Sequence, residues 1–284
     1  MAGIRLALAY LIAHTFLSAL AIRHVQIPVW VFAANLTAIA AFAYILARGR
    51  SGGFKSESVR WSVLWLPVLT FWICYGWSEW TLHAFHPPGE TWDAAFIAIE
   101  RQIGQPTLWM AKGGSSILTE TASIFYASYY LYMLTLGVAL TRRKEYKAFE
   151  EAVFAVSLGY AASYIVFALV PLWGPRWAFV DAGLLDVSEQ QLRGGFVTDL
   201  LNQIQYGGVA LKGGAMPSSH TSTGVVFAVW CGRIWGWKAG AAAWIVVAGM
   251  CFGAMYARYH YALDIVGGAA LGMASLRLAR KAVP

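Results

Sequence analysis

The chain has 284 residues, of which 59% are apolar and 12% are charged, with a mean hydropathy of +0.55. Average soluble domains carry roughly 25% charged residues, so this composition excludes an ordinary soluble enzyme. Lipid must replace the missing polar surface, which indicates an integral membrane protein. A net charge of +7 also occurs in nucleic-acid-binding proteins, but here Lys and Arg form short clusters between apolar runs. We therefore expect membrane lipids, and no nucleic acid, as partners.

Eight stretches are apolar and long enough to form membrane-spanning helices, each of which needs about 20 residues. In chain order they cover residues 4–22, 28–47, 61–82, 117–141, 149–171, 221–234, 239–256 and 261–278. The sixth stretch is short, and its helix is expected to begin earlier. The first has almost no basic leader and no convincing small-residue cleavage site, so it is interpreted as a retained helix. The sequence thus predicts an all-α membrane protein with about eight spans.

Basic clusters predict how the spans are oriented. Lys and Arg gather in residues 48–60, 142–147, 233–238 and 277–281, which fall on one side of the membrane if every span crosses it. Cytoplasmic loops collect Lys and Arg, whereas short exported loops do not. Both termini are therefore predicted to be cytoplasmic, in the inner or plasma membrane of a cell. Residues 83–116, 172–220 and 257–260 would then face outward.

Two outer segments have amphipathic patterns. Residues 92–103 place Trp92, Phe96, Ile99 and Ile103 on one helical face, which is typical of a helix in the membrane interface or of a cap on the bundle.

The second amphipathic segment covers residues 188–204, within a connection of more than 40 residues. Ser188 and Gln191 have the spacing of a capping box, which predicts a helix start. Loops that merely connect helices are shorter than this connection. The segment is interpreted as a lid over an external site, with a disordered connection as the alternative.

Three short stretches on the predicted outer face contain residues suited to catalysis: Gly174-Pro-Arg176, Met216-Pro-Ser-Ser-His220 and Arg258-Tyr-His260-Tyr-Ala-Leu-Asp264. In the third, His260 and Asp264 are spaced i, i+4, so both side chains project from the first turn of one helix. Asp264 can accept the Nδ1 proton of His260 and leave Nε2 free as a nucleophile or base. The alternative is an Asp that only stabilises the helix start, next to an interfacial His.

The second stretch opens the sixth predicted span. Ser218 or Ser219 can cap this helix, and the free N–H groups of its first turn form an anion site. His220 beside that site can donate a proton to a departing oxygen. The alternative is a plain helix cap with an interfacial His.

Cations on the same predicted face are candidate phosphate ligands. Arg176, held after a proline at the outer end of the fifth span, can clamp phosphate bidentately or extend to lipid headgroups. Lys212 and Arg258 are further candidates, each as consistent with the surface as with a site.

Other ionisable residues give weaker indications. Glu79 and Glu120 lie near the outer ends of spans, where an ionisable group is a candidate substrate contact. Carboxylate, His and Cys side chains do not show the spacing of metal ligands, so no metal and no cofactor are expected. Cys74, Cys231 and Cys251 also lack paired spacing and are interpreted as packing residues.

Together these motifs resemble the type 2 phosphatidic acid phosphatase (PAP2) superfamily. Its signature has three separated elements: a Lys/Arg element, Pro-Ser-x-His, and a His with an Asp four residues later. Residues 217–220 read Pro-Ser-Ser-His and match the second element, and His260 with Asp264 matches the third.

The resemblance implies a six-helix catalytic membrane domain in residues 61–284, preceded by two additional helices in residues 1–60. It also implies that His260 is the nucleophile that becomes phosphorylated, that Asp264 orients it, and that His220 is the general acid. No metal is implied.

The first and third elements depart from the superfamily pattern. Leu169 stands where a Lys is expected, and Trp177 rather than Pro follows Arg176. Ala254 stands where an Arg usually precedes the His by six positions. Such loss is similar to the branch containing inositol phosphorylceramide synthases, which combines a reduced first element with His-Tyr-x-x-Asp, as in residues 260–264.

The resemblance implies a lipid-phosphate phosphatase or phosphotransferase that acts on a phospholipid or prenyl phosphate through a phosphohistidine. Members of the similar branch also move a phosphorylated headgroup to a lipid alcohol, so a lipid alcohol acceptor is expected. A plain lipid phosphatase is the first alternative. A transporter or an inactive lipid-binding scaffold are alternatives of another class, although the helix centres carry almost no ionisable residues of the kind that ion pathways use.

Overall fold

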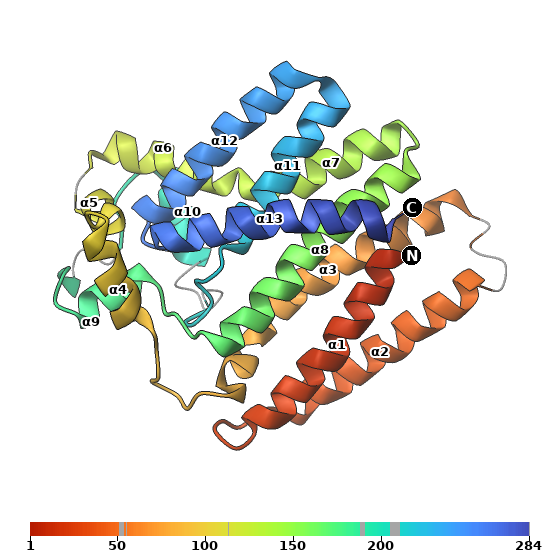
Figure 1. Ribbon diagram of the computed structural model, residues 1–284, viewed down its shortest axis with the longest axis horizontal. Helices are drawn as coiled ribbons and strands as arrows, with labels where there is room; N and C mark the ends of the chain where they lie inside the picture. Colours follow the sequence, from red (N-terminus) through yellow and green to blue (C-terminus); the bar gives the residue numbers. More distant parts are fainter. Residues whose placement is uncertain (51–53, 55, 113, 188–190, 205–210, 284) are drawn as a thin grey trace.

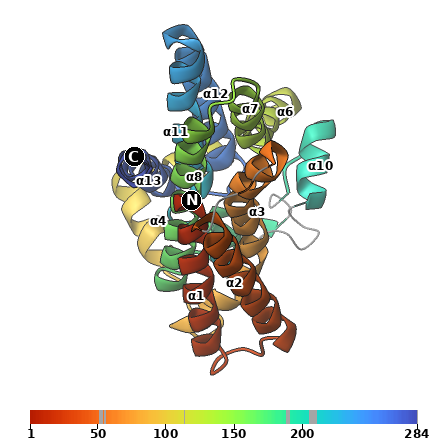
Figure 2. The same cartoon turned by 90° about the vertical axis from the view of Figure 1, so that its right-hand side faces the viewer.

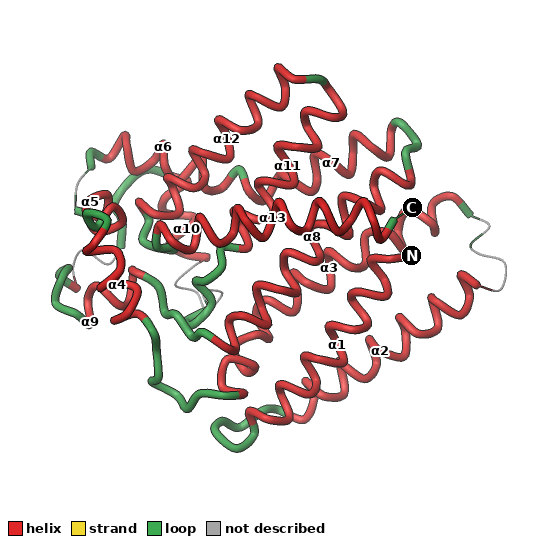
Figure 3. The backbone as a smooth tube through the Cα atoms, in the orientation of Figure 1, coloured by secondary structure: helices red, strands yellow, loops and turns green. Residues whose placement is uncertain are grey.

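The chain folds into a bundle of helices. The computed structural model describes residues 1–283 except 51–53, 55, 113, 188–190 and 205–210. In chain order the helices are α1 (Ala2–Ala21), α2 (Val29–Arg50), α3 (Glu57–Thr81), the short 3₁₀ helix η1 (Leu82–Ala84), α4 (Asp93–Gln102), α5 (Pro106–Ala111), α6 (Ser116–Ala127), α7 (Tyr129–Arg142), α8 (Tyr146–Leu169), α9 (Pro175–Asp181), α10 (Phe196–Ile204), α11 (Ser219–Trp235), α12 (Trp237–Tyr256) and α13 (Ala262–Ala282). The described residues contain no strand, only isolated bridges between Leu172 and the pair Gly213 and Gly214 (Figure 3). The all-α prediction is confirmed.

Seven helical segments of the described chain are long and apolar enough to cross a membrane. They are α1, α2, α3 with η1, α6 with α7, α8, α12 and α13. Each overlaps one of the eight predicted spans, so an integral membrane fold is confirmed. The remaining predicted span, the sixth in chain order, is α11, which is shorter than the others.

The length of α11 is set by its two ends. The helix begins at Ser219, two residues before the predicted span, because the Ser218 hydroxyl accepts a 3.2 Å hydrogen bond from the Thr221 N–H. Gly236, with φ 89°, follows its last residue. The 17 residues between these ends rise ~26 Å. Since α11 packs against α7, α8, α12 and α13, protein rather than lipid surrounds most of it.

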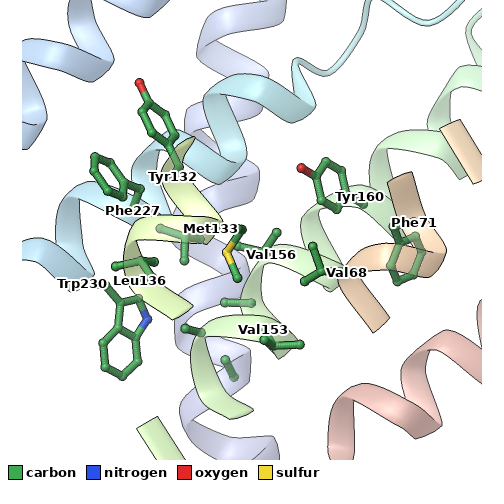
Figure 4. Packing of buried hydrophobic residues seen from close by; sticks show 14 of the residues in the cluster. Val68, Phe71, Tyr132, Met133, Leu136, Val153, Val156, Tyr160, Phe227 and Trp230 are labelled. Carbon is green, nitrogen blue, oxygen red and sulfur yellow. The ribbon is translucent and has the colours of Figure 1, made fainter. Parts of the chain in front are cut away.

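The core of the bundle is built around α8. Figure 4 shows Val153 and Val156 of α8 between Val68 of α3 and the α7 residues Met133 and Leu136. These side chains are almost completely buried. The packing fixes α8 as the central helix that links α3 to α7 and α11.

Two glycines allow α13 to lie directly against α11. A Cβ atom on Gly268 would collide with the Ser218 carbonyl, and one on Gly272 would collide with the Ser222 carbonyl. A Gly-x-x-x-Gly spacing of this kind is typical of helices that approach closely in a membrane. The close approach brings the first turns of α11 and α13 side by side.

The two N-terminal helices lie at one edge of the bundle (Figure 2). Of these, α1 packs against α3 and α8, while α2 packs mainly against α1. Both chain termini and the turn between α7 and α8 lie at one end of the molecule, and α4, α5 and α9 gather at the opposite end (Figure 1). The division into residues 1–60 and 61–284 stays a prediction.

Candidate active site

A cavity of about 300 Å³ lies between the ends of α11 and α13 and the helices α3, α6, α7 and α8. Most of its wall is aromatic, and its polar side chains come from the segments that the sequence singled out. The polar lining consists of Arg176, Ser219, His220, Arg258 and His260. Residues more than 80 positions apart in the chain therefore meet in one chamber.

His260 is held at the floor of this cavity by the start of α13. Its Nδ1 lies 3.4 Å from Oδ2 of Asp264, which is completely buried. The same Oδ2 accepts a 2.8 Å hydrogen bond from the Tyr261 N–H, so Asp264 also caps the helix. The two alternatives for Asp264, helix cap and partner of His260, thus occur together. This contact leaves Nε2 of His260 facing the cavity.

His220 stands between His260 and a tyrosine of α6. Its Nδ1 lies 3.4 Å from Nε2 of His260, and its Nε2 lies 3.1 Å from the Tyr126 hydroxyl. A hydroxyl that donates to Nε2 holds the single proton of a neutral imidazole on Nδ1, the nitrogen that faces His260. The sequence reasoning missed Tyr126. With Tyr129 and Tyr130 it forms an aromatic stripe, a pattern typical of a buried helix face.

Two buried guanidinium groups line the same cavity. Arg176 and Arg258 are 5% and 4% exposed, and the Arg176 N–H donates a 2.8 Å hydrogen bond to the Arg258 carbonyl. The Arg176 guanidinium lies 4.5 Å from the centre of the Tyr259 ring, and Arg258 donates a 2.5 Å hydrogen bond to the Ala111 carbonyl. Arg176 is therefore directed into the protein rather than toward lipid headgroups. The pair supplies two positive charges near His260.

Of the three remaining candidate phosphate ligands, one lines the cavity and two do not. Ser219 lines the cavity, whereas Ser218 is fully buried in the cap of α11 and is not part of the lining. Lys212 is exposed, and its Nζ lies 3.6 Å from the centre of the Trp173 ring, outside the lining. A cation–π contact of this kind holds an ammonium group on the protein surface.

Glu120 makes a structural contact that the sequence did not indicate. Its carboxylate accepts hydrogen bonds from the N–H groups of Gly195, Val197 and Thr198, and from the Thr198 hydroxyl, all between 2.8 and 3.0 Å. These groups form the start of α10, so Glu120 of α6 fastens α10 to the bundle. Glu79 is exposed on α3 and does not line the cavity.

The segment predicted as a lid contains α10, which is amphipathic as expected. Ser188, the predicted helix cap, lies outside the described residues, and α10 begins later, at Phe196. Leu201 of α10 is buried in a cluster with Tyr126 and Ala254. The helix therefore covers part of the tyrosine that contacts His220.

Among the described residues, no group of three or more His, Cys, Asp or Glu side chains could hold a metal ion. The three cysteines are free thiols, two of them buried. What the cavity does offer is an imidazole next to a buried carboxylate, a second imidazole beside it, and two cations.

Comparison with known proteins places the chain in a family. A family model described as the PAP2 superfamily matches residues 94–278, which is most of the chain and includes every polar residue of the cavity. Fold and match together define an integral membrane protein of a phosphatase-type family. The chain belongs to the PAP2 superfamily. No curated protein and no solved structure matched it.

Proposed function

We propose that the protein is a membrane lipid-phosphate phosphatase or phosphotransferase that works through a phosphohistidine on His260. The observation that carries the proposal is the position of His260, between the buried Asp264 and the ring of His220. Arg176 and Arg258 line the same cavity and supply positive charge for a phosphate group. Positioning and charge stabilisation provide most of the rate in phosphoryl transfer.

In the proposed first step, Nε2 of His260 attacks the phosphorus atom and the bond from phosphorus to the leaving oxygen breaks. Asp264 accepts a hydrogen bond from the Nδ1–H of His260 and stabilises the positive charge that develops on the ring. His220 takes up a proton when the anionic phosphate binds beside it, and donates this proton to the leaving oxygen. In the second step, water or an alcohol attacks phosphorus, and the bond from phosphorus to Nε2 of His260 breaks. His220 accepts the proton of the attacking oxygen, which returns both rings to their starting states.

A lipid substrate is supported by the way the cavity meets the bilayer. Trp72 of α3 and Tyr130 of α7 line the cavity, yet they are 43% and 44% exposed on helices that can cross a membrane. A headgroup in the cavity can therefore keep its chains in lipid. We propose a phospholipid or a prenyl phosphate as substrate.

The proposal is tested by incubating the purified protein in detergent with phosphatidate, prenyl diphosphate and phosphatidylinositol. Free phosphate and lipid products are measured together. Release or transfer of phosphate from at least one lipid is expected, and it should continue in EDTA because the proposed steps use only protein groups. A transporter or an inactive scaffold would turn over none of the three.

Transfer to a lipid alcohol, as in the inositol phosphorylceramide synthase-like branch, is a second candidate. The observation that favours it is α10, whose Leu201 covers Tyr126 beside His220. A phosphohistidine open to water is hydrolysed, so transfer requires a covered site. Glu120 fastens that cover by accepting four hydrogen bonds from its first turn.

The Glu120→Ala variant is therefore expected to shift the products from lipid transfer toward free phosphate. Loss of the carboxylate leaves three N–H groups at the start of α10 without their acceptor, so the helix detaches more readily. Thin-layer separation of labelled lipid from labelled phosphate gives the ratio. Glu79→Ala removes an exposed carboxylate near the end of another span and should leave the ratio unchanged. Equal ratios in both variants, or an intact enzyme that yields only phosphate with every acceptor, contradict the synthase-like proposal.

The active site is proposed to face the exterior of the cell, with both termini in the cytoplasm. Single cysteines replacing Arg101 and Asp181, which are exposed at the end of the molecule that holds α4 and α9, should react with an impermeant maleimide in intact cells. A cysteine replacing Lys144, exposed in the turn after α7, should react only after permeabilisation. The three native cysteines are removed first. The reverse labelling pattern would invert the topology.

A further inference from the structure

Helix α4 carries two buried carboxylates on one face. Asp93 is 3% exposed and Glu100 is 2% exposed, and Ile97 lies between them on the same face. Neither carboxylate lines the active-site cavity. Burying a carboxylate costs free energy unless hydrogen bonds replace its lost water. The groups that donate to these two side chains therefore indicate what α4 holds in place.

Asp93 joins two segments that are far apart in the chain. Its Oδ1 accepts hydrogen bonds from the Gly174 N–H at 3.1 Å and from the Tyr261 hydroxyl at 2.7 Å. Its Oδ2 accepts a 2.7 Å hydrogen bond from the Trp173 N–H. Gly174 lies directly before α9, and Tyr261 directly before α13. One oxygen atom thus ties the start of α9 to the start of α13.

Glu100 fastens the second of these segments again. Its Oε1 accepts a 2.7 Å hydrogen bond from the Ala262 N–H, at the first residue of α13. The same carboxylate accepts hydrogen bonds from the hydroxyl and the N–H of Thr107, at 2.9 and 3.2 Å. All of these donors are internal to the protein, so α4 acts as a brace between the cavity segments.

The braced segments carry the groups that the proposed chemistry needs. Arg176 is two residues after Gly174, and His260 is the residue before Tyr261. Both side chains line the cavity, whereas Asp93 contacts the two segments without lining the cavity itself. Misplacement of reacting groups by about 1 Å can cost roughly 100-fold in rate.

We propose that Asp93 is a positioning residue, which fixes the separation between the His260 imidazole and the Arg176 guanidinium. The inference rests on the proposed function, because it depends on these two groups acting on one phosphate. Tyr261 is the critical link: it is completely buried, and its ring packs against Phe96 and Phe179. Burial raises the pKa of Tyr261, as does the nearby Asp93 carboxylate, so the phenol keeps the proton that it donates.

The test removes the hydrogen bond from the Tyr261 hydroxyl to Asp93 and keeps the contacts of the Tyr261 ring with Phe96 and Phe179. Tyr261→Phe deletes only the hydroxyl, while the bonds from Trp173 and Gly174 to Asp93 persist. Orthovanadate serves as the probe, because it mimics a phosphoryl group in transfer and its binding is measurable as a rise in unfolding temperature. The dissociation constant for vanadate is expected to rise about tenfold, which corresponds to about 1.4 kcal/mol of binding free energy.

Tyr256→Phe is the matched control. It also deletes a buried phenol hydroxyl with a polar partner, the Thr119 hydroxyl at 2.8 Å, but it lies outside the cavity lining and outside the brace. This control should lose a similar amount of thermal stability and keep the vanadate affinity of the wild type. Asp93→Asn, which turns one accepting oxygen into a donor, should lose more vanadate affinity than Tyr261→Phe.

Three outcomes decide the inference. Weaker vanadate binding in Tyr261→Phe with normal binding in Tyr256→Phe supports the positioning role. Normal vanadate binding in Tyr261→Phe, whatever its stability, overturns the positioning role and leaves the proposed function intact. A wild-type protein that does not bind vanadate overturns the proposed function, and the inference falls with it.

Discussion

Replacing His260 by alanine is expected to lower lipid-phosphate turnover by roughly 10⁴-fold or more, because the group that forms the covalent intermediate is lost. His260 is 4% exposed, and after its removal the buried Asp264 carboxylate still accepts the Tyr261 N–H, so the cap of α13 is kept. Initial rates with the best lipid of the substrate panel measure the effect. His24→Ala, in the connection between α1 and α2, is the matched control and should retain full activity.

His220→Ala should behave differently from His260→Ala. Loss of a general acid typically costs about 10²–10⁴-fold, and here it slows both the formation and the breakdown of the phosphoenzyme. The variant should still incorporate labelled phosphate, more slowly than the wild type. Turnover in His260→Ala that equals that of His220→Ala, or exceeds it, would contradict the division of roles.

Asp264→Asn is expected to lower the maximal rate by about 10²–10⁴-fold while leaving the fold in place. With its oxygen at the position of Oδ2, the asparagine still accepts the Tyr261 N–H and still faces Nδ1 of His260, so the cap of α13 persists. A neutral amide oxygen does not stabilise the positive charge that develops on the His260 ring as the carboxylate does, so the rate falls.

Single-turnover rates measure the effect of Asp264→Asn without interference from product release. Asp181→Asn changes an exposed carboxylate at the end of α9 and should be silent. A rate within a few-fold of the wild type would mean that Asp264 serves only as a helix cap.

The spans were the easiest part of the fold to predict, since apolar runs of sufficient length have few other uses. The exception is α11, whose apolar run is cut short by the cap at Ser218 and by Gly236. Its neighbours could not be read from the chain, and they determine that it lies inside the bundle. Hydropathy therefore located all eight helices but did not separate the internal helix from those that face lipid.

The amphipathic pattern of α4 was predicted correctly, but the pattern did not indicate that this helix also buries two carboxylates. The predicted face with Trp92, Ile99 and Ile103 exists and is largely exposed. The adjacent face buries Asp93 and Glu100, whose i, i+7 spacing was visible in the sequence. Carboxylates on the polar face of an amphipathic helix normally meet water. Only the tertiary structure shows that these two meet backbone N–H groups and hydroxyls from other segments.

The candidate site was partly predictable because its main residues lie in short motifs at helix ends. The spacing of His260 and Asp264 predicted their contact, and the small residues on α13 brought His220 beside them. Ser218 caps α11, as one of the two predicted alternatives had it, whereas the contact between the Lys212 ammonium group and the Trp173 ring was not indicated by the sequence. The aromatic wall comes from α3, α6, α7, α8 and α9 and from the loops that hold Trp173 and Tyr259, and no local pattern relates these segments.

The most direct test of the proposed mechanism is to locate the covalent phosphate. The wild-type protein is incubated briefly with a ³²P-labelled lipid phosphate, quenched in alkali, digested, and the labelled peptide is sequenced by mass spectrometry. We expect an acid-labile, base-stable phosphate on His260 and none in the His260→Ala variant. Phosphate on His220, or on any residue in the His260→Ala variant, would contradict the assignment of His260 as the nucleophile.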